Sequence, residues 1–262
     1  MISNYITWTA NPQIFHIGSL SVRWYGLLFA MSFAVGYFIM LRFFRKEKIA
    51  DTVLDKLSMY MLIATVIGAR LGHVLFYEPA SYLAHPLDIL KIWEGGLASH
   101  GAAIGILLGL YFFARSEKRT YFWTLDRIVI VVALAGFFIR MGNLMNSEIY
   151  GNETTLPWGF IFERVGETLP KHPTQIYEAL SYLAIFAYLI SYYYRKDGKP
   201  REGYLFGFFL VSLFSVRFII EFLKEPQVSF ENSMALNMGQ LLSIPFIIAG
   251  LYIIFRKVKT EV

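Results

Sequence analysis

Several ionisable side chains stand at the ends of long apolar runs, where a charge is costly and usually functional. Arg140 and Asn143 follow the run IVIVVALAGFF and, being three residues apart, share one helical face. Arg217 ends a second apolar run. A guanidinium keeps its charge in low dielectric and offers paired donors, so two of them suit a phosphate group. The spacing predicts a site for phosphate or a phospholipid head.

A structural alternative exists for the second run. Arg217 and Glu221 are four residues apart on one helical face, so they could instead form an internal ion pair that lets both lie within a helix bundle. Glu178 opens a further run, and we expect it to pair with an arginine. The residues alone leave the phosphate site and the internal pair open.

His100 lies in the glycine-rich segment EGGLASHGAAIG. Glycines let a backbone approach a ligand and expose the N–H groups of a helix start, and an imidazole titrates near neutral pH and can act as a base. The alternative is a histidine bonded to backbone, among glycines that allow tight helix packing. Both interpretations stay open.

The other buried-looking polar groups favour structural roles. Arg70 and His73 are expected to line a polar interior or pair with a carboxylate, and Asp126 begins a helix as a first-turn carboxylate. Tyr25 opens an apolar run, where an interfacial aromatic belt is the usual reason.

Common catalytic motifs are absent from the sequence. There is no phosphate-binding loop, no H-E-x-x-H, no G-x-S-x-G and no dinucleotide fingerprint, and there is no cysteine. His16, His85 and His172 lack metal-ligand spacing. ATP hydrolysis, metalloprotease and serine-esterase chemistry are therefore not expected, and neither is a metal or a cofactor.

The elements that must position these groups are apolar helices. Of 262 residues, 56% are hydrophobic and 16% are charged, whereas a soluble domain carries about a quarter charged residues. Runs of about 18 or more apolar residues predict membrane-spanning helices. We expect seven, in an all-α polytopic membrane protein, over Trp24–Leu41, Leu57–Tyr77, Leu97–Ala114, Ile128–Met145, Ile176–Tyr194, Tyr204–Leu223 and Met238–Phe255.

Loop charges predict the orientation. The segments RFFRKEK, RSEKR, RKDGKPRE and RKVK hold fourteen of the 24 Lys and Arg residues, whereas the alternate loops hold few. Since cytoplasmic loops are rich in Lys and Arg, the N-terminus is expected outside and the C-terminus inside. The net charge of +5 then reflects membrane orientation, so nucleic-acid binding is not expected.

No linker divides the chain, and we expect one integral membrane domain over residues 1–262. Residues 1–23 lack the features of a signal peptide and are expected to form an arm at the membrane interface. Residues 147–175 carry turn signals and short β-prone pieces, which predict a small extracytoplasmic cap.

Seven blocks of the sequence, in order, resemble the bacterial prolipoprotein diacylglyceryl transferase family. They are RWYGLLFA, GARLGHVLFY, EGGLASHGAAIG, IRMGNLMNSEIYG, HPTQIYEAL, RFIIEFLKEP and MGQLLSIP, and together they cover essentially the whole chain. The resemblance implies a seven-helix enzyme of the bacterial inner membrane, with its active site toward the outer leaflet. The implied partners are phosphatidylglycerol, the lipobox of a preprolipoprotein signal peptide and the bilayer.

The implied reaction transfers the diacylglyceryl group of phosphatidylglycerol to the lipobox cysteine thiol, with a thioether formed and glycerol phosphate released. The resemblance makes Arg140 the ligand of the phospholipid head, Arg217 a second essential arginine and His100 a histidine that helps deprotonate the thiol. It also connects further residues with activity or substrate binding: Tyr25, Asp126, Asn143, Asn146, Glu148, Gly151 and Glu221.

Three positions depart from the family pattern. Ile139 stands where glycine is usual, Lys224 where arginine is common, and SHGAA where the histidine is usually followed by two glycines. A transporter whose charges line a path is the alternative from another class, but no internal repeat supports it. A headgroup hydrolase would differ only in its acceptor.

Overall fold

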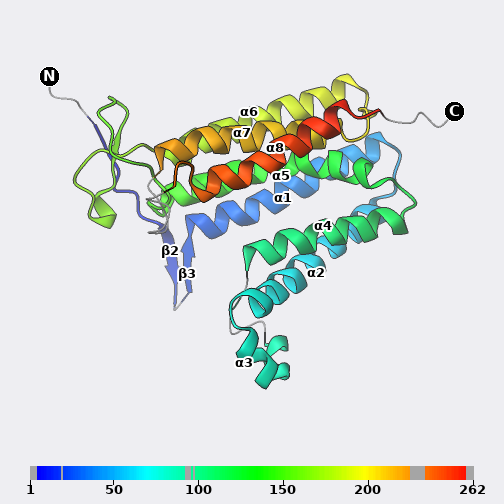
Figure 1. The fold of residues 1–262 in the computed structure, drawn as a ribbon, viewed down its shortest axis with the longest axis horizontal. Helices are drawn as coiled ribbons and strands as arrows, with labels where there is room; N and C mark the ends of the chain where they lie inside the picture. The colour runs from blue at the N-terminus through cyan, green and yellow to red at the C-terminus, as the bar shows by residue number, and fades with distance from the viewer. Residues whose placement is uncertain (1–4, 19, 92–95, 97, 225–233, 258–262) are drawn as a thin grey trace. The chain divides into compact units, whose positions relative to one another are not determined.

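The computed structural model describes residues 5–18, 20–91, 96, 98–224 and 234–257. Within them the chain is mostly helical (Figure 1). The long helices are α1 (Trp24–Lys46), α2 (Asp51–Phe76), α4 (Ser99–Ser116), α5 (Tyr121–Met145), α6 (Thr174–Arg195), α7 (Tyr204–Ile220) and α8 (Met238–Phe255). Each overlaps one of the seven expected segments, although Leu97, where the third was expected to begin, lies outside the described residues.

Five of these helices are long and apolar enough to cross a membrane: α1, α2, α5, α8, and α7 together with the short 3-10 helix η4 (Glu221–Leu223). The described part of α4 is apolar but shorter. α6 carries six tyrosines, which lower its hydropathy. The architecture is that of a polytopic helical membrane protein, and the number of seven spans stays a prediction.

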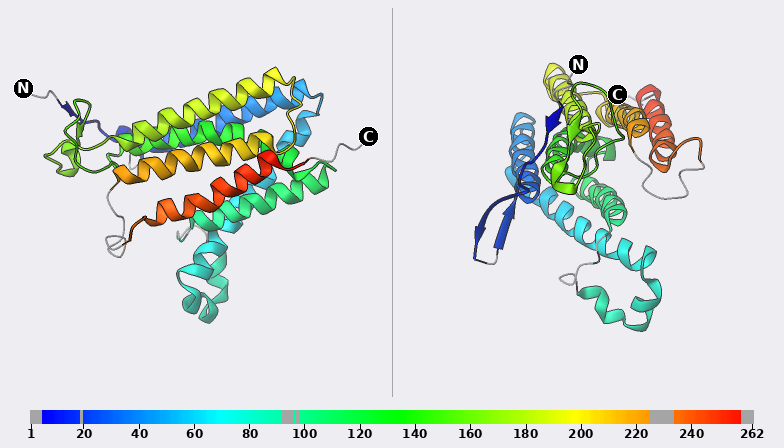
Figure 2. Two further views of the ribbon diagram at one scale, coloured as in Figure 1. Left: turned by 45° about the horizontal axis from the view of Figure 1, so that its top comes forward. Right: turned by 90° about the vertical axis from the view of Figure 1, so that its left-hand side faces the viewer.

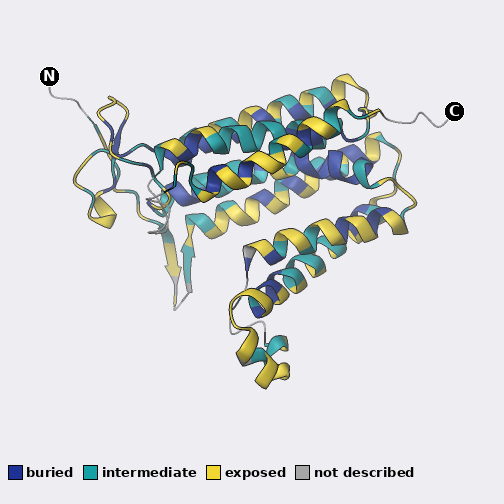
Figure 3. Ribbon diagram, in the orientation of Figure 1, coloured by how far each residue is buried: buried dark blue, intermediate teal, exposed yellow. Residues whose placement is uncertain are grey.

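The chain divides into two compact units. Unit 1 comprises residues 1–40 and 126–262, and unit 2 comprises residues 41–125. In unit 1, α7 packs against both α6 and α8, as two views show (Figures 1 and 2). α5 is the most enclosed of the five candidate spans, because 44% of its most apolar stretch is buried, compared with 22–33% in the other four (Figure 3).

Short strands join the N-terminal arm to the 147–175 segment, called here the cap loop. β1 (Ile6–Thr7) pairs in parallel with β4 (Phe160–Ile161), and β2 (Gln13–Ile17) pairs with β3 (Leu20–Arg23) as a hairpin before α1. The cap loop also holds the 3-10 helix η3 (Glu163–Val165). The expected all-α fold therefore holds for the long elements, and the strands are confined to the arm and the cap loop.

An apolar cluster anchors the cap loop to the end of α5. Leu144 packs with Phe160 and Phe162, and Trp8 lies against them and donates its indole N–H to the Leu144 carbonyl at 3.0 Å. Because three segments far apart in sequence share this cluster, the chain that follows Met145 is fixed close to the helix end. That chain carries several of the expected site residues.

Glycines join α2 to α4 in unit 2. A Cβ built on Gly101 would lie 2.2 Å from the Gly68 carbonyl oxygen, and one on Gly105 would lie 2.3 Å from that of Ala64. Only small residues permit such close backbones, which is the usual means of packing helices in membranes. The short helices α3 (Pro79–Ala84) and η1 (Pro86–Leu90) follow α2.

Candidate active site

Arg140 lies on α5, one turn before the helix ends, and its side chain is 18% exposed. Its Nε lies 2.7 Å from Oε2 of Glu178 on α6, and its Nη1 donates to Oδ1 of Asn143 at 3.2 Å. The expected shared face of Arg140 and Asn143 is confirmed, and so is the expected pairing of Glu178 with an arginine. A guanidinium has five N–H groups, so these contacts fix its orientation without consuming all of its donors.

Glu178 is fully buried and lies between two cations. Lys224, just after η4, donates to Oε1 of Glu178 at 2.9 Å, and its Nζ also lies 3.8 Å from Oε2 of Glu221. A buried carboxylate stays ionised only when such partners compensate the lost water. Lys224, one of the departures from the family pattern, therefore takes a structural position that an arginine could share.

The residues after Arg140 form a polar network at the end of α5. Asn143 and Asn146 both donate their side-chain amides to Oε1 of Glu148, at 2.9 and 3.1 Å. Asn143 thus links Arg140 to Glu148, with its oxygen accepting from one and its nitrogen donating to the other. Three residues expected in the site are brought together here with Arg140. Arg140, Asn143, Asn146, Glu148 and Glu178 are called the Arg140 region below.

Two close approaches complete this region. A Cβ on Gly151 would lie 2.3 Å from the Leu223 carbonyl oxygen, so the cap loop passes directly against the end of η4. A Cβ on Gly142 would lie 2.8 Å from the Tyr25 ring. The Tyr25 ring therefore packs against α5 at Gly142, which lies between Arg140 and Asn143 in the sequence. Both expected residues therefore adjoin the Arg140 region.

Arg217 and Tyr182 belong to the same region. The Tyr182 hydroxyl on α6 is close enough to the Arg140 side chain for a hydrogen bond. It also lies near enough to Arg217 to interact with the charge of that guanidinium. Among the described residues, no carboxylate lies within ion-pair distance of Arg217, and Glu221 pairs with Lys224 instead. The internal Arg217–Glu221 pair left open by the sequence is therefore not the arrangement found.

Glu221 is held in place by the start of α8. A Cβ on Gly239 would lie 2.5 Å from the Glu221 carboxyl carbon, so that carboxylate packs directly against Gly239 and would have to shift for a larger residue. Asn237 and Gln240 form a reciprocal cap on α8, and the Asn237 amide also donates to the Glu221 carbonyl at 3.4 Å. Gly239 and this cap together fix the position of Glu221.

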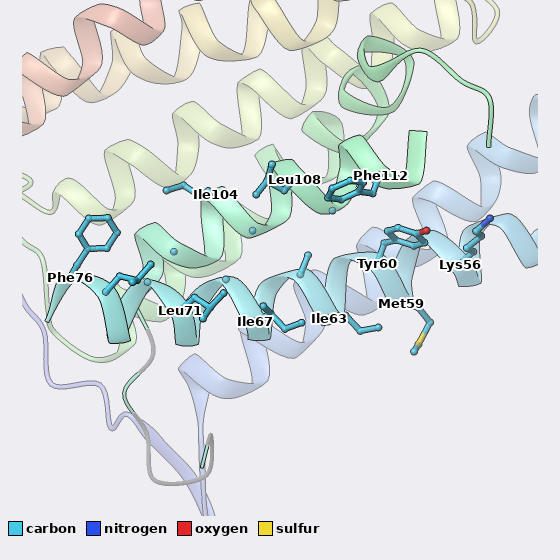
Figure 4. A pocket seen from close by; sticks show the side chains of 17 residues that line it. Lys56, Met59, Tyr60, Ile63, Ile67, Leu71, Phe76, Ile104, Leu108 and Phe112 are labelled. Carbon is cyan, nitrogen blue, oxygen red and sulfur yellow. The ribbon is translucent and has the colours of Figure 1, made fainter. Parts of the chain in front are cut away.

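His100 lies in unit 2, as the second residue of α4, and is exposed. The adjacent Gly101 packs against the Gly68 and Gly72 backbones, which confirms the expected tight helix packing for the glycines. One face of the α2–α4 pair is an open apolar groove of about 820 Å³, lined by side chains such as Ile67 and Leu108 (Figure 4).

Asp126 lies at the opposite end of α5 from Arg140, about 21 Å away at 1.5 Å per residue. Its two carboxylate oxygens accept from the backbone N–H groups of Gly203 and Phe206, at 2.7 and 2.8 Å, and so cap α7. Arg127 donates to the Gly198 carbonyl at 3.2 Å. Asp126 is thus buried in a capping role, and its expected substrate contact receives no support from this position.

Arg70 and His73 order the chain after α2. Arg70 donates to the carbonyl oxygens of Asp88, Ile89 and Gly96, at 2.5, 2.9 and 3.2 Å. His73 stacks on Tyr77 and lies 3.9 Å from Glu78. Their expected structural role fits these contacts.

Sequence reasoning gave no site role to Thr174 and Gln175, which open α6. Both are fully buried, and they donate to the carbonyls of Ile149 and Glu148, at 2.8 and 2.7 Å. The nearby His172 is partly buried, which lowers the pKa of its imidazole. Thr174 and Gln175 stand in the block HPTQIYEAL close to Glu178, and this position could have indicated a role near the site. No sequence pattern indicated which carbonyl groups their side chains would contact.

Comparison with known proteins bears on this geometry. The family model described as prolipoprotein diacylglyceryl transferase matches residues 12–256. A phosphatidylglycerol–prolipoprotein diacylglyceryl transferase of Tolumonas auensis is 50% identical over 97% of this chain and 98% of its own length. Proteins of the same description from Chloroherpeton thalassium and Porphyromonas gingivalis are 46% and 45% identical, each over 98% of this chain and 96% of their own length.

Proposed function

Since the chain belongs to the prolipoprotein diacylglyceryl transferase family, we propose that its Arg140 region binds the phosphate of the lipid substrate. The protein is a membrane transferase of lipoprotein maturation, which moves a diacylglyceryl group from phosphatidylglycerol to a prolipoprotein. The observation that carries the proposal is Arg140, oriented by Glu178 and Asn143 and close to Tyr182, which is also in electrostatic range of Arg217.

The proposed reaction is a displacement at a glycerol carbon. The thiolate of the lipobox cysteine forms a C–S bond to the carbon that carries the phosphoester, and the C–O bond to the phosphate breaks. Glycerol phosphate leaves with the electron pair of that bond, and the thiol proton goes to a base. A thiol has a pKa of about 8.5, so at neutral pH the attack requires help with this proton.

The arginines act on the leaving group. As the C–O bond breaks, negative charge grows on the phosphate oxygen, and fixed cations in a low-dielectric region stabilise that charge. Arg140 is held by Glu178 on one side, so its remaining N–H groups can present a planar pair of donors. Arg217 lacks a carboxylate partner among the described residues and supplies a second positive charge.

The finer assignments are part of this proposal. Tyr25, Asn143, Asn146, Glu148, Gly151 and Glu221 shape the headgroup region, and His100 receives the thiol proton. Asp126 affects the headgroup region indirectly, because it caps the start of α7 and so helps to position that helix. The chain crosses the bacterial inner membrane seven times, with the Arg140 region toward the outer leaflet and the lipobox segment entering from that side. No cofactor or metal takes part.

The test is transfer of diacylglyceryl from phosphatidylglycerol to a lipobox peptide by the purified protein. Arg140→Lys keeps the charge but loses the planar donors, so we expect kcat to fall by about 100-fold or more, as on loss of one transition-state donor. The measurement is release of glycerol phosphate together with lipidation of the peptide.

Arg164→Lys is the matched control, because Arg164 is an exposed arginine of the cap loop. Turnover of Arg140→Lys close to wild type would contradict the role of the planar donors. Release of glycerol phosphate without peptide would identify a headgroup hydrolase instead.

A further inference from the structure

Ile149 has a backbone conformation that its side chain disfavours. Five described non-glycine residues have positive φ, and four of them, Lys48, Lys118, Ser147 and Asp197, lie two residues beyond the end of a helix. At each of these four ends the next N–H reaches back five residues to a helix carbonyl, which is a standard helix ending.

Ile149, with φ of 60°, does not belong to this set. It lies beyond the helix ending of α5, and its side chain is β-branched, the type for which positive φ is a true outlier. Such a conformation persists only where surrounding contacts impose it, and it is found mainly at functional sites.

The contacts that impose it come from the start of α6. Thr174 Oγ1 donates to the Ile149 carbonyl at 2.8 Å, and Gln175 Nε2 donates to the Glu148 carbonyl at 2.7 Å. Both side chains are fully buried, and Oε1 of Gln175 has no hydrogen-bond partner among the described residues. Burying the Gln175 amide oxygen without a partner costs free energy, and the hydrogen bond that its Nε2 donates to the Glu148 carbonyl offsets this cost.

This turn sets the position of the polar network. Glu148 precedes Ile149, and its carboxylate accepts from Asn143 and Asn146. Asn143 in turn accepts from Arg140. A rotation of the turn would move the Glu148 carboxylate away from the two amides, and Asn143 would then lose its orientation toward Arg140.

We propose that Thr174 and Gln175 are positioning residues for the transfer reaction: they hold the turn at Ile149 in its strained conformation and thereby orient Arg140 through Glu148 and Asn143. This inference rests on the proposed role of Arg140. The two residues act through the carbonyls of the turn and not through contact with a substrate.

The experiment removes each donor and then removes the strain. Thr174→Val and Gln175→Met are expected to lower kcat by about fivefold to tenfold, the worth of a lost hydrogen bond, while KM for phosphatidylglycerol changes by less than about twofold. Glycine adopts positive φ readily, so Ile149→Gly lets the turn form without its restraints. Added to Thr174→Val, it is expected to restore kcat to within about twofold of Ile149→Gly alone.

Ile149 is 39% exposed, so its replacement by glycine opens no buried cavity. Thr154→Val is the matched control, since Thr154 is a buried threonine of the cap loop whose hydroxyl, among the described residues, accepts only from Leu156 N at 3.2 Å. Thermal unfolding of every variant is measured beside its kinetics, because a residue with only a structural role would lower stability and leave the kcat of the folded enzyme unchanged.

Three results would overturn the inference: wild-type kcat in both Thr174→Val and Gln175→Met, a loss of kcat in Thr174→Val that Ile149→Gly fails to restore, or failure of that double variant to fold. A wild-type protein without transfer activity would instead reject the proposed function. Wild-type kcat in both Thr174→Val and Gln175→Met together with a large loss in Arg140→Lys would reject only this inference.

Discussion

At the scale of single residues, the Arg140 region is organised by shared carboxylates. Glu178 places one oxygen on Arg140 and the other on Lys224, and Lys224 also approaches Glu221. Each buried charge thus has an opposite charge beside it, which offsets the cost of removing it from water. Arg217 has no such carboxylate among the described residues, so an anionic phosphate would balance it.

His100 is the residue whose proposed role depends most directly on pH. If it takes the thiol proton, His100→Gln should lose about 100-fold in kcat at pH 7, within the range for general base catalysis. The loss should shrink toward pH 9, because a thiol of pKa about 8.5 then ionises without help. The measurement is the pH profile of peptide lipidation.

His85→Gln provides the comparison, as His85 is an exposed histidine of the same unit. A constant loss from pH 7 to pH 9 in His100→Gln would show that the imidazole orients a substrate and does not move the proton.

At the scale of elements, glycines allow the closest helix contacts in both units. α2 and α4 touch through glycine backbones, α7 and α8 approach at Gly207 and Gly250, and the Tyr182 ring of α6 lies over Gly136 of α5. The glycine contact fixes a close separation of α2 and α4, and its glycines together with apolar side chains of both helices line the groove of Figure 4. This packing sets the start of α4, where His100 lies.

Gly105→Ala tests that contact. The added Cβ would lie 2.3 Å from the Ala64 carbonyl oxygen, so the helices must separate, at a cost of about 1–3 kcal/mol. We expect the midpoint of thermal unfolding to fall by about 2–4 °C for each kcal/mol.

Gly26→Ala is the matched substitution, because a Cβ at Gly26 in α1 meets no atom within 4 Å. Alanine favours helix over glycine, so this variant should be as stable as wild type or slightly more so. Equal melting temperatures for the two variants would contradict close packing at Gly105.

At the scale of the whole molecule, five helices of the described part of the chain meet the requirements of a membrane span, and the fourteen basic residues of four segments favour one orientation. α6 departs from a simple apolar span because of its tyrosines and its buried Glu178. Two of these groups meet neighbouring helices: the Tyr188 hydroxyl oxygen lies 2.8 Å from that of Tyr204 on α7, and Glu178 meets Arg140 on α5.

The proposed orientation can be tested with single cysteines, because the chain has none of its own. Arg164→Cys in the cap loop and Lys199→Cys in the loop after α6 are both at exposed positions. With a thiol reagent that cannot cross the membrane, residue 164 should be labelled on intact cells and residue 199 only after permeabilisation. The reverse pattern would invert the proposed topology.

The sequence by itself determined the helices, their order and the Arg140–Asn143 face. Apolar runs and local spacing are sufficient for these, because the hydrogen bonds of a helix and its side-chain periodicity are local. The seven blocks also determined the family. The positive charge of four loops predicted an orientation, since that preference depends on composition alone.

Only the tertiary structure decided which charges meet. Glu178 and Lys224 are far apart in sequence, and nothing in either block indicated that they would lie at 2.9 Å. The same holds for Thr174, which reaches the turn at Ile149, and for Asp126, which caps α7. Such partners are selected by the packing of helices against one another, and that packing depends on contacts between segments that sequence periodicity does not specify.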